Sequence, residues 1–252
     1  YEIFCDRFVY FEISNICRAV FGDDHIIDMH SEAFRAKPHS AYIYGSVIED
    51  GTIYDSEEIA KALHSVGSVA VCDNTFASVF NINPIEQGTD IVIDSMSKYF
   101  TGDAGIQSAL AVFNEKAKIF IDGLIYPLAQ AMGVLAGKRS AEALNNSIDT
   151  AKERFITLEK NARVVNRFLR EHAITTKFPN MGSAIWITGI DVNCHNAFKF
   201  IQPNATFGLS HITYSVYSSD INDRCRWWLR LSCGLEPPKN YIDDLKIIVN
   251  SK

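Results

Sequence analysis

The stretch Ile91-Val92-Ile93-Asp94-Ser95-Met96-Ser97-Lys98-Tyr99 places a lysine just after a short apolar run. Twenty-five positions before Lys98, Asp73 ends a second apolar run, Ser68-Val69-Ala70-Val71-Cys72. Short apolar runs bounded by polar residues predict buried β-strands. We therefore expect an acid and an amine at the ends of two adjacent buried strands, an arrangement that has few purely structural uses.

Strand and helix patterns alternate through the first half of the chain. Residues 55–67 predict an amphipathic helix in which Ser56 is the N-cap and Gly67 ends the helix. Residues 84–88 predict one helical turn closed by Gly88. The predicted strands are residues 41–44, 69–72, 91–93 and 108–113. This alternation predicts an α/β fold with a mostly parallel sheet covered by helices on both faces.

The second half begins with a helical pattern over residues 140–172, whose length suits a helix that connects two domains. Three predicted strands (183–188, 211–216 and 227–231) and a closing helix (239–249) follow it. We therefore predict a large α/β domain at residues 1–150. Residues 151–252 then comprise the connecting helix and a small C-terminal α+β domain, with the boundary between 140 and 180.

The composition argues against several classes of protein. The chain of 252 residues is 47% hydrophobic, enough for a substantial core, and carries a net charge of −6. An acidic balance argues against nucleic-acid binding, which usually needs a basic surface. No apolar run is long enough for a membrane span, so we predict no membrane partner. The histidines lack metal-ligand spacing and the six scattered cysteines lack a CxxC pair, so we predict no metal and a reducing, cytoplasmic compartment.

Asp73 and Lys98 have ordinary explanations when taken singly. An acid after a strand often caps the next helix, and most lysines are solvated. Together they provide what pyridoxal phosphate (PLP) needs, which is an amine that forms a Schiff base with the aldehyde and a carboxylate that pairs with the pyridinium nitrogen. Ser95 and Ser97 offer hydroxyls beside the lysine that are either phosphate ligands or ordinary loop serines.

Arg230 alternates with apolar residues in the predicted strand 227–231. Such an arginine is either a salt-bridged structural residue or a fork that binds a carboxylate through two hydrogen bonds. The second interpretation suits the α-carboxylate of an amino-acid substrate.

Three segments resemble motifs of one enzyme family. Residues 71–77 (VCDNTFA) are similar to the family's VDNTFA segment, and residues 88–103 (GTDIVIDSMSKYFTGD) are similar to its GADIVVHSATKYLGGH block. Residues 229–245 resemble its IRLSVGLEDVEDLIADL segment. The chain thus resembles the Cys/Met-metabolism PLP-dependent enzymes, which include cystathionine γ-lyase, cystathionine β-lyase, methionine γ-lyase and cystathionine γ-synthase.

The resemblance implies the fold type I architecture of PLP-dependent transferases, with PLP as the cofactor. It implies that Lys98 is the Schiff-base lysine and general base, and that Asp73 pairs with the ring nitrogen. The other residues that it implies for the cofactor are Ser95, Ser97 and Thr75, and those for the substrate carboxylate are Arg230 and Thr206. It also implies a homo-oligomer, a dimer of dimers, and places the family's glycine-rich phosphate loop and a tyrosine–arginine pair from the neighbouring subunit upstream of Tyr1.

The implied function is that of a PLP-dependent carbon–sulfur lyase acting by β- or γ-elimination on a sulfur-containing amino acid, a small-molecule substrate of transsulfuration or related amino-acid metabolism. Phe207 favours β-elimination, because β-lyases often carry an aromatic residue at this position. A γ-replacement synthase or sulfhydrylase would use the same residues. Another fold type I enzyme, such as an aminotransferase, would share the lysine, the aspartate and the arginine.

A further alternative is a degenerate, non-catalytic homologue that serves as the partner subunit of an active enzyme. Ile48 and loops that differ from the family pattern motivate it. Ile48 stands where the family has an asparagine that contacts the ring hydroxyl. A separate departure is Asp103, which stands where the family has a histidine.

Overall fold

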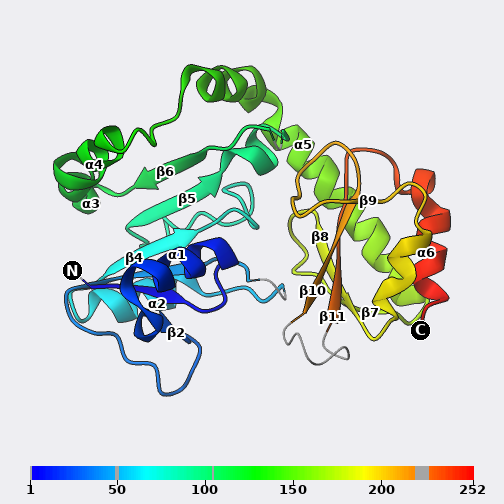
Figure 1. Cartoon of the computed structure of the whole chain (residues 1–252), viewed down its shortest axis with the longest axis horizontal. Coiled ribbons are helices and arrows are strands. Elements are labelled where there is room, and N and C mark those ends of the chain that lie inside the picture. The colour runs from blue at the N-terminus through cyan, green and yellow to red at the C-terminus, as the bar shows by residue number, and fades with distance from the viewer. Residues whose placement is uncertain (1, 49–50, 104, 219–226) are drawn as a thin grey trace. The chain divides into compact units, whose positions relative to one another are not determined.

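The computed structural model describes residues 2–48, 51–103, 105–218 and 227–252. Its contacts divide the chain into two compact units, shown together in Figure 1. Unit 1 comprises residues 1–95 and 108–141, and unit 2 comprises residues 96–107 and 142–252. Unit 2 therefore takes a short segment from the first half of the chain, and this segment carries Lys98. The predicted domains at 1–150 and 151–252 stay predictions.

Unit 1 is built on a six-stranded sheet in the order β2-β1-β3-β4-β5-β6 (Figure 1). Its strands are β1 (Glu2–Asp6), β2 (Ile26–Ile27), β3 (Ser40–Gly45), β4 (Val69–Asp73), β5 (Ile91–Ser95) and β6 (Ala109–Phe113). All neighbouring strands are parallel except β5 and β6, which are antiparallel. The prediction of an α/β fold with a mostly parallel sheet is confirmed.

The helical segments of unit 1 are α1 (Phe11–Phe21), η1 (Asp23–His25), α2 (Ser56–His64), α3 (Glu115–Phe120), η3 (Ile121–Ile125) and α4 (Tyr126–Ala131). The predicted N-cap of α2 was wrong by one residue. Asp55 has the extended backbone of a cap and accepts a hydrogen bond from the Glu58 N–H at 3.0 Å, whereas Ser56 is already helical. Gly67 follows the helix with φ of 72°, as a helix stop requires.

The core of unit 1 forms where alternate strand side chains meet α2. Tyr44 of β3, Cys72 of β4 and Val92 of β5 are buried together with Ala60 and Leu63 of the helix. Full burial of a side chain such as leucine contributes roughly 1.5–3 kcal/mol. The alternation of the strands therefore fixes which side chains face α2 and which face the opposite side of the sheet.

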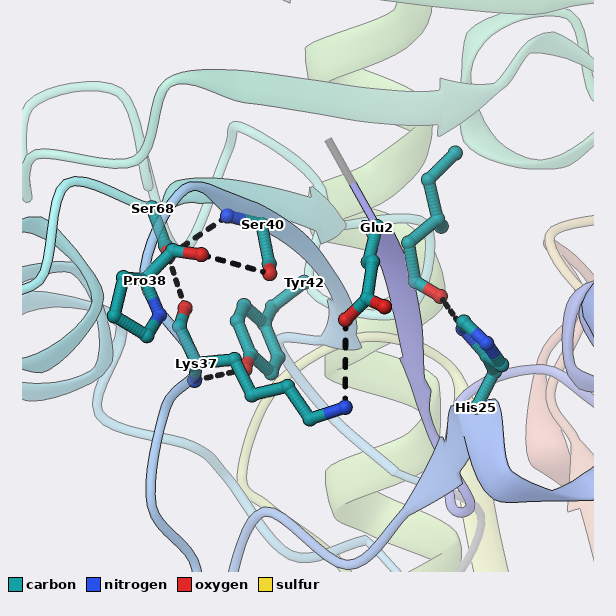
Figure 2. A network of polar contacts seen from close by, with 8 residues as sticks. Glu2, His25, Lys37, Pro38, Ser40, Tyr42 and Ser68 are labelled. Carbon is teal, nitrogen blue, oxygen red and sulfur yellow. Dashed lines mark hydrogen bonds and ion pairs between the residues drawn. The ribbon is translucent and has the colours of Figure 1, made fainter.

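A polar network ties the start of β1 to the loops before β3 and β4 (Figure 2). Lys37 pairs with Glu2 at 3.3 Å, and its backbone N–H donates to the Tyr42 hydroxyl at 2.6 Å. The Ser68 hydroxyl donates to the Lys37 carbonyl at 2.6 Å and accepts from the Ser40 N–H at 3.1 Å. These bonds satisfy loop backbone groups and help to set the register of the parallel strands.

Unit 2 contains a five-stranded sheet in the order β7-β8-β11-β10-β9 (Figure 1). Its strands are β7 (Thr175–Lys177), β8 (Ala184–Thr188), β9 (Gln202–Pro203), β10 (Thr213–Ser218) and β11 (Trp227–Ser232). Its helical segments are η2 (Met96–Phe100), η4 (Val192–Ala197), η6 (Pro238–Tyr241), α6 (Ile242–Val249) and most of α5 (Lys138–Glu171). The predicted long helix, the three predicted strands and the closing helix are confirmed.

The core of unit 2 joins the two long helices to the sheet. Val165 and Leu169 of α5 are buried with Leu229 of β11 and with Leu245 and Ile248 of α6. The spacing of four residues in α5 and of three residues in α6 places these side chains on one face of each helix. Among the described residues, no helix is both long enough and apolar enough to cross a membrane.

Candidate active site

In unit 1, the structure brings three of the predicted site residues together. Asp73 is the last residue of β4, and its Oδ1 accepts from the Thr75 N–H at 3.0 Å and the Thr75 hydroxyl at 2.6 Å. The same hydroxyl oxygen accepts from the Ser95 N–H at the end of β5, at 3.0 Å. Thr75 therefore orients the Asp73 carboxylate and anchors it to the neighbouring strand.

The local sequence accounts for this arrangement. The Thr75 N–H turns back onto the Asp73 carboxylate in an Asx-type turn, for which aspartate is well suited. Asn74, which lies between Asp73 and Thr75, is fully buried. Its backbone N–H donates to the Ile93 carbonyl at 2.8 Å, and its side-chain amide donates to the Ile82 carbonyl at 2.9 Å. The two residues that follow Asp73 thus both hold the turn in place.

A second acid, Asp94, lies on β5 and is only 6% exposed. Its side chain shares a sheet face with Val92 and Cys72, because residues two apart along a strand point the same way and Cys72 is paired with Val92. Burial, and then the nearby negative charge of Asp73, raise the pKa of Asp94 to about 7. We did not predict a role for this residue, although an acid directly after the apolar run 91–93 was a usable signal.

In unit 2, Lys98 lies within η2, a short π-helical segment in which it alone departs from helical dihedral angles, with φ of −88° and ψ of −110°. Its Nζ donates to the Thr206 hydroxyl and lies 5.1 Å from the centre of the Phe207 ring. A hydroxyl accepts a hydrogen bond from a neutral amine as well as from an ammonium group. The Thr206 hydroxyl therefore orients the Lys98 amine beside the Phe207 ring.

Arg230 lies on β11 and is 4% exposed. Its Nη2 donates to the Ala205 carbonyl at 2.8 Å and to the Ser215 hydroxyl at 3.0 Å, and the guanidinium carbon lies 5.6 Å from the centre of the Phe207 ring. Phe207 is therefore within cation–π distance of both Lys98 and Arg230. Since these hydrogen bonds start from one nitrogen, they fix the plane of the guanidinium fork.

The segment that follows Lys98 is tightly anchored within unit 2. Tyr99 is buried, its hydroxyl accepts from the Ser183 N–H at 3.0 Å, and its ring packs edge-on against Phe155 at 4.7 Å. Burial raises the pKa of the Tyr99 phenol to about 12, so the phenol stays protonated at neutral pH. Arg154 of α5 donates to the Phe100 carbonyl at 2.7 Å.

Two positions are less suited to the roles that the resemblance implies. The Ser97 hydroxyl donates to the Ile106 carbonyl, so that proton is already used and would have to be redirected to bind a phosphate. Ile48 is buried in the apolar core of unit 1 with Tyr44, and it supplies no hydrogen bond from its side chain.

The types of side chain nevertheless fit PLP. Lys98 offers an amine held by a hydroxyl, Asp73 offers an oriented carboxylate, and Arg230 offers a buried guanidinium. These are the groups that covalent attachment, pairing with the ring nitrogen and carboxylate recognition require. Among the described residues, no group of three or more histidine, cysteine, aspartate or glutamate side chains could hold a metal ion.

Comparison with known proteins finds a match to one protein family over most of the chain. The family model described as "Cys/Met metabolism PLP-dependent enzyme" matches residues 15–185. L-methionine gamma-lyase of Fusobacterium nucleatum subsp. polymorphum is 26% identical over 153 residues, which cover 60% of this chain and 38% of that protein. Cystathionine gamma-lyase of Dictyostelium discoideum is 28% identical over 155 residues, with the same two shares. The matched stretch thus spans about two fifths of the length of these relatives.

Solved structures show the same fold at lower sequence identity. Cystathionine gamma-lyase from Lactobacillus plantarum, complexed with L-serine, superposes with a TM-score of 0.83 at 19% identity, covering 99% of this chain and 76% of that one. A methionine gamma lyase from Micromonospora echinospora gives 0.82 at 17% identity, covering 100% and 75%. These likenesses confirm the predicted fold class.

Proposed function

Because the chain belongs to the Cys/Met-metabolism PLP-dependent enzyme family, we propose that it serves PLP-dependent cleavage of a carbon–sulfur bond in a sulfur-containing amino acid. The observation that carries the proposal is the surroundings of Lys98, whose amine contacts the Thr206 hydroxyl and lies over the Phe207 ring. When bound, PLP supplies an aldehyde that captures amino groups and a ring that withdraws electrons from the substrate α-carbon.

Lys98 has two tasks in this proposal. Its Nζ binds the cofactor covalently, and once released it takes the proton from the substrate α-carbon as a general base and can return it to the leaving sulfur. The Thr206 hydroxyl orients Nζ between these tasks. We expect Lys98→Ala to lose both, because no other amine would occupy this position.

In this proposal, Asp73 acts on the cofactor ring and Arg230 acts on the substrate carboxylate. The Asp73 carboxylate, held by Thr75, keeps a proton on the ring nitrogen, so Asp73→Asn should retain some PLP but slow turnover by orders of magnitude. The Arg230 fork binds the substrate carboxylate and so determines which bond at the α-carbon is cleaved. Ser95, Ser97 and Thr75 are proposed to help bind the cofactor.

The choice between β- and γ-elimination is also a proposal. Phe207, which packs beside Lys98 and Arg230, favours a β-lyase. The named relatives include lyases of the γ type, so both products should be assayed. A homo-oligomer and a cytoplasmic location stay predictions.

The decisive experiment is borohydride reduction of the full chain after incubation with PLP, followed by peptide mapping by mass spectrometry. We expect a visible absorption band that reduction abolishes and a phosphopyridoxyl adduct on Lys98, absent from Lys98→Ala. Wild-type protein that stays colourless and unlabelled, or an adduct confined to another lysine, would overturn the proposal and favour a non-catalytic subunit. Release of pyruvate and ammonia from a β-thioether, against 2-oxobutyrate from a γ-thioether, then identifies the reaction.

A further inference from the structure

The direction of the Lys98 side chain depends on the short segment η2. The backbone dihedrals at Lys98 are non-helical although its neighbours form a helical segment. Carbonyl groups at the end of a helical segment lack partners within it and carry partial negative charge. Groups that bind these carbonyls therefore help to determine where the Lys98 amine points.

Arg154 supplies such a group from α5. One of its terminal nitrogens, Nη2, donates to the Phe100 carbonyl at 2.7 Å and to the Tyr99 carbonyl at 3.3 Å. The other, Nη1, donates to the Ser147 carbonyl at 3.1 Å and to the Thr150 hydroxyl on its own helix. One nitrogen of the guanidinium thus binds α5 and the other binds the carbonyls at the end of η2. Charge-assisted hydrogen bonds of this kind are stronger than neutral ones.

Gly208 holds the same segment by a direct backbone contact. It has φ of 79°, and a Cβ at this position would lie 2.9 Å from the Lys98 carbonyl carbon and 3.1 Å from the Tyr99 nitrogen. These distances are too short for any side chain to fit without a shift of the backbone. Gly208 also lies two residues after Thr206, whose hydroxyl accepts the hydrogen bond from Lys98 Nζ.

We propose that Arg154 is a positioning residue, which holds the carbonyls of Tyr99 and Phe100 so that the Lys98 amine is aimed for attachment of the PLP aldehyde, with Gly208 as the backbone contact against which the segment is held. This inference rests on the proposed function, because it assumes that Lys98 is the PLP lysine. It adds two residues that act through Lys98.

Two roles of Arg154, positioning Lys98 and merely stabilising the fold, predict different results when Arg154 is replaced. If Arg154 only tied α5 to η2, its loss would lower the melting temperature while Lys98 in the folded protein kept its reactivity. If it positions Lys98, its loss slows covalent capture of PLP by protein that is still folded. Small misplacements of reacting groups can cost on the order of a hundredfold in rate.

The test measures the rate at which the full chain, freed of cofactor, forms a borohydride-trapped PLP adduct on Lys98. Variants Arg154→Lys and Arg154→Ala are compared with wild type and with Arg163→Lys. Arg163 is a matched control because it lies on the same helix but pairs with Glu159 at 2.8 Å. Melting curves and far-UV circular dichroism of each variant report the folded fraction, to which the rates are normalised.

We expect Arg154→Lys and Arg154→Ala to trap PLP at least about tenfold more slowly than wild type, and Arg163→Lys to match wild type. Millimolar guanidinium should restore part of the rate in Arg154→Ala, whereas equal sodium chloride should not. Wild-type rates in both folded Arg154 variants would overturn the inference.

A second variant keeps the inference falsifiable if Arg154→Ala does not fold. Gly208→Ala should slow trapping, because the new Cβ displaces the backbone at Lys98, and a normal trapping rate in folded Gly208→Ala would contradict the proposed contact. Failure of the proposed function has a different signature, since the wild-type chain itself would then carry no adduct on Lys98.

Discussion

Replacing Asp94 by asparagine should stabilise unit 1 at neutral and alkaline pH but not in acid. The carboxyl of Asp94 is 6% exposed, and burial together with the charge of Asp73 raises its pKa from 3.8 to about 7. Asparagine has nearly the shape of the protonated acid and stays neutral. It therefore removes the cost of a buried charge without removing packing.

The sign and size of the effect follow from proton linkage. Between pH 3.8 and about pH 7, the folded chain keeps a proton on Asp94 that the unfolded chain has lost. The unfolding free energy of wild type therefore falls as pH rises through this window and levels off above about pH 7. The pKa difference corresponds to a ceiling of roughly 4 kcal/mol, which local relaxation and water entry reduce.

Hydrogen exchange by mass spectrometry on peptides that cover β4 and β5 is the appropriate assay. Tryptophan fluorescence would not report this region, because Trp186, Trp227 and Trp228 all belong to unit 2. Comparison of the variant with wild type at one pH cancels the intrinsic dependence of exchange on pH. Global urea titrations at the same pH values give the accompanying change in unfolding free energy.

The expected gain in Asp94→Asn is largest above about pH 7 and vanishes below about pH 4. The control is Asp243→Asn, because Asp243 is exposed and a hydrogen bond from Lys246 lowers its pKa. That variant should show no such gain as pH rises. A gain in Asp94→Asn that is equal at acidic and alkaline pH would refute the reasoning, since it would show that charge on Asp94 is not what destabilises the fold.

Three further predictions concern the proposed site and the second unit. Arg230→Lys should raise KM for the amino-acid substrate by about tenfold or more, because lysine cannot form a two-pronged bond to a carboxylate; an unchanged KM would make Arg230 a structural residue. Thr75→Val removes the hydroxyl that links Asp73 to β5, so PLP dissociation, measured by absorbance, should be faster, and the melting temperature should fall because the Ser95 N–H loses its acceptor. Asp244→Ala should cost about 3–5 kcal/mol of unfolding free energy, because this buried carboxylate accepts hydrogen bonds from the backbone N–H groups of residues 199–201. Tryptophan fluorescence in denaturant would measure this loss, and a loss near zero would contradict the assigned bonds.

The regular elements were largely predictable from sequence, because they depend on the periodicity of neighbouring residues. The apolar runs at 69–72 and 91–93 became β4 and β5, and the helical pattern at 140–172 became α5. The N-cap at Asp55 was missed because adjacent aspartate and serine are both good caps, and only the backbone angles decide between them. The short strands β2 and β9 have two residues each and offer no periodicity to detect.

Within the candidate site, residue types and motif spacing are enough to single out Lys98, Asp73 and Arg230. The contacts that hold these side chains are not accessible in this way. Thr75 bridges Asp73 to Ser95, and Gly208 touches the backbone of Lys98. Nothing in the local sequence pairs these positions, because each contact depends on how separate elements pack.

The sequence by itself therefore determined the family, the strand and helix pattern, and the residue types that suit PLP, since all of these reside in local order and motif spacing. Only the tertiary structure decided that Lys98 meets Thr206 and Gly208, more than a hundred residues later, and that Arg154 grips the carbonyls beside it. The physical reason is that side-chain direction and hydrogen-bond partners are set by the summed packing of distant segments, whereas periodicity constrains only which face of each element is buried.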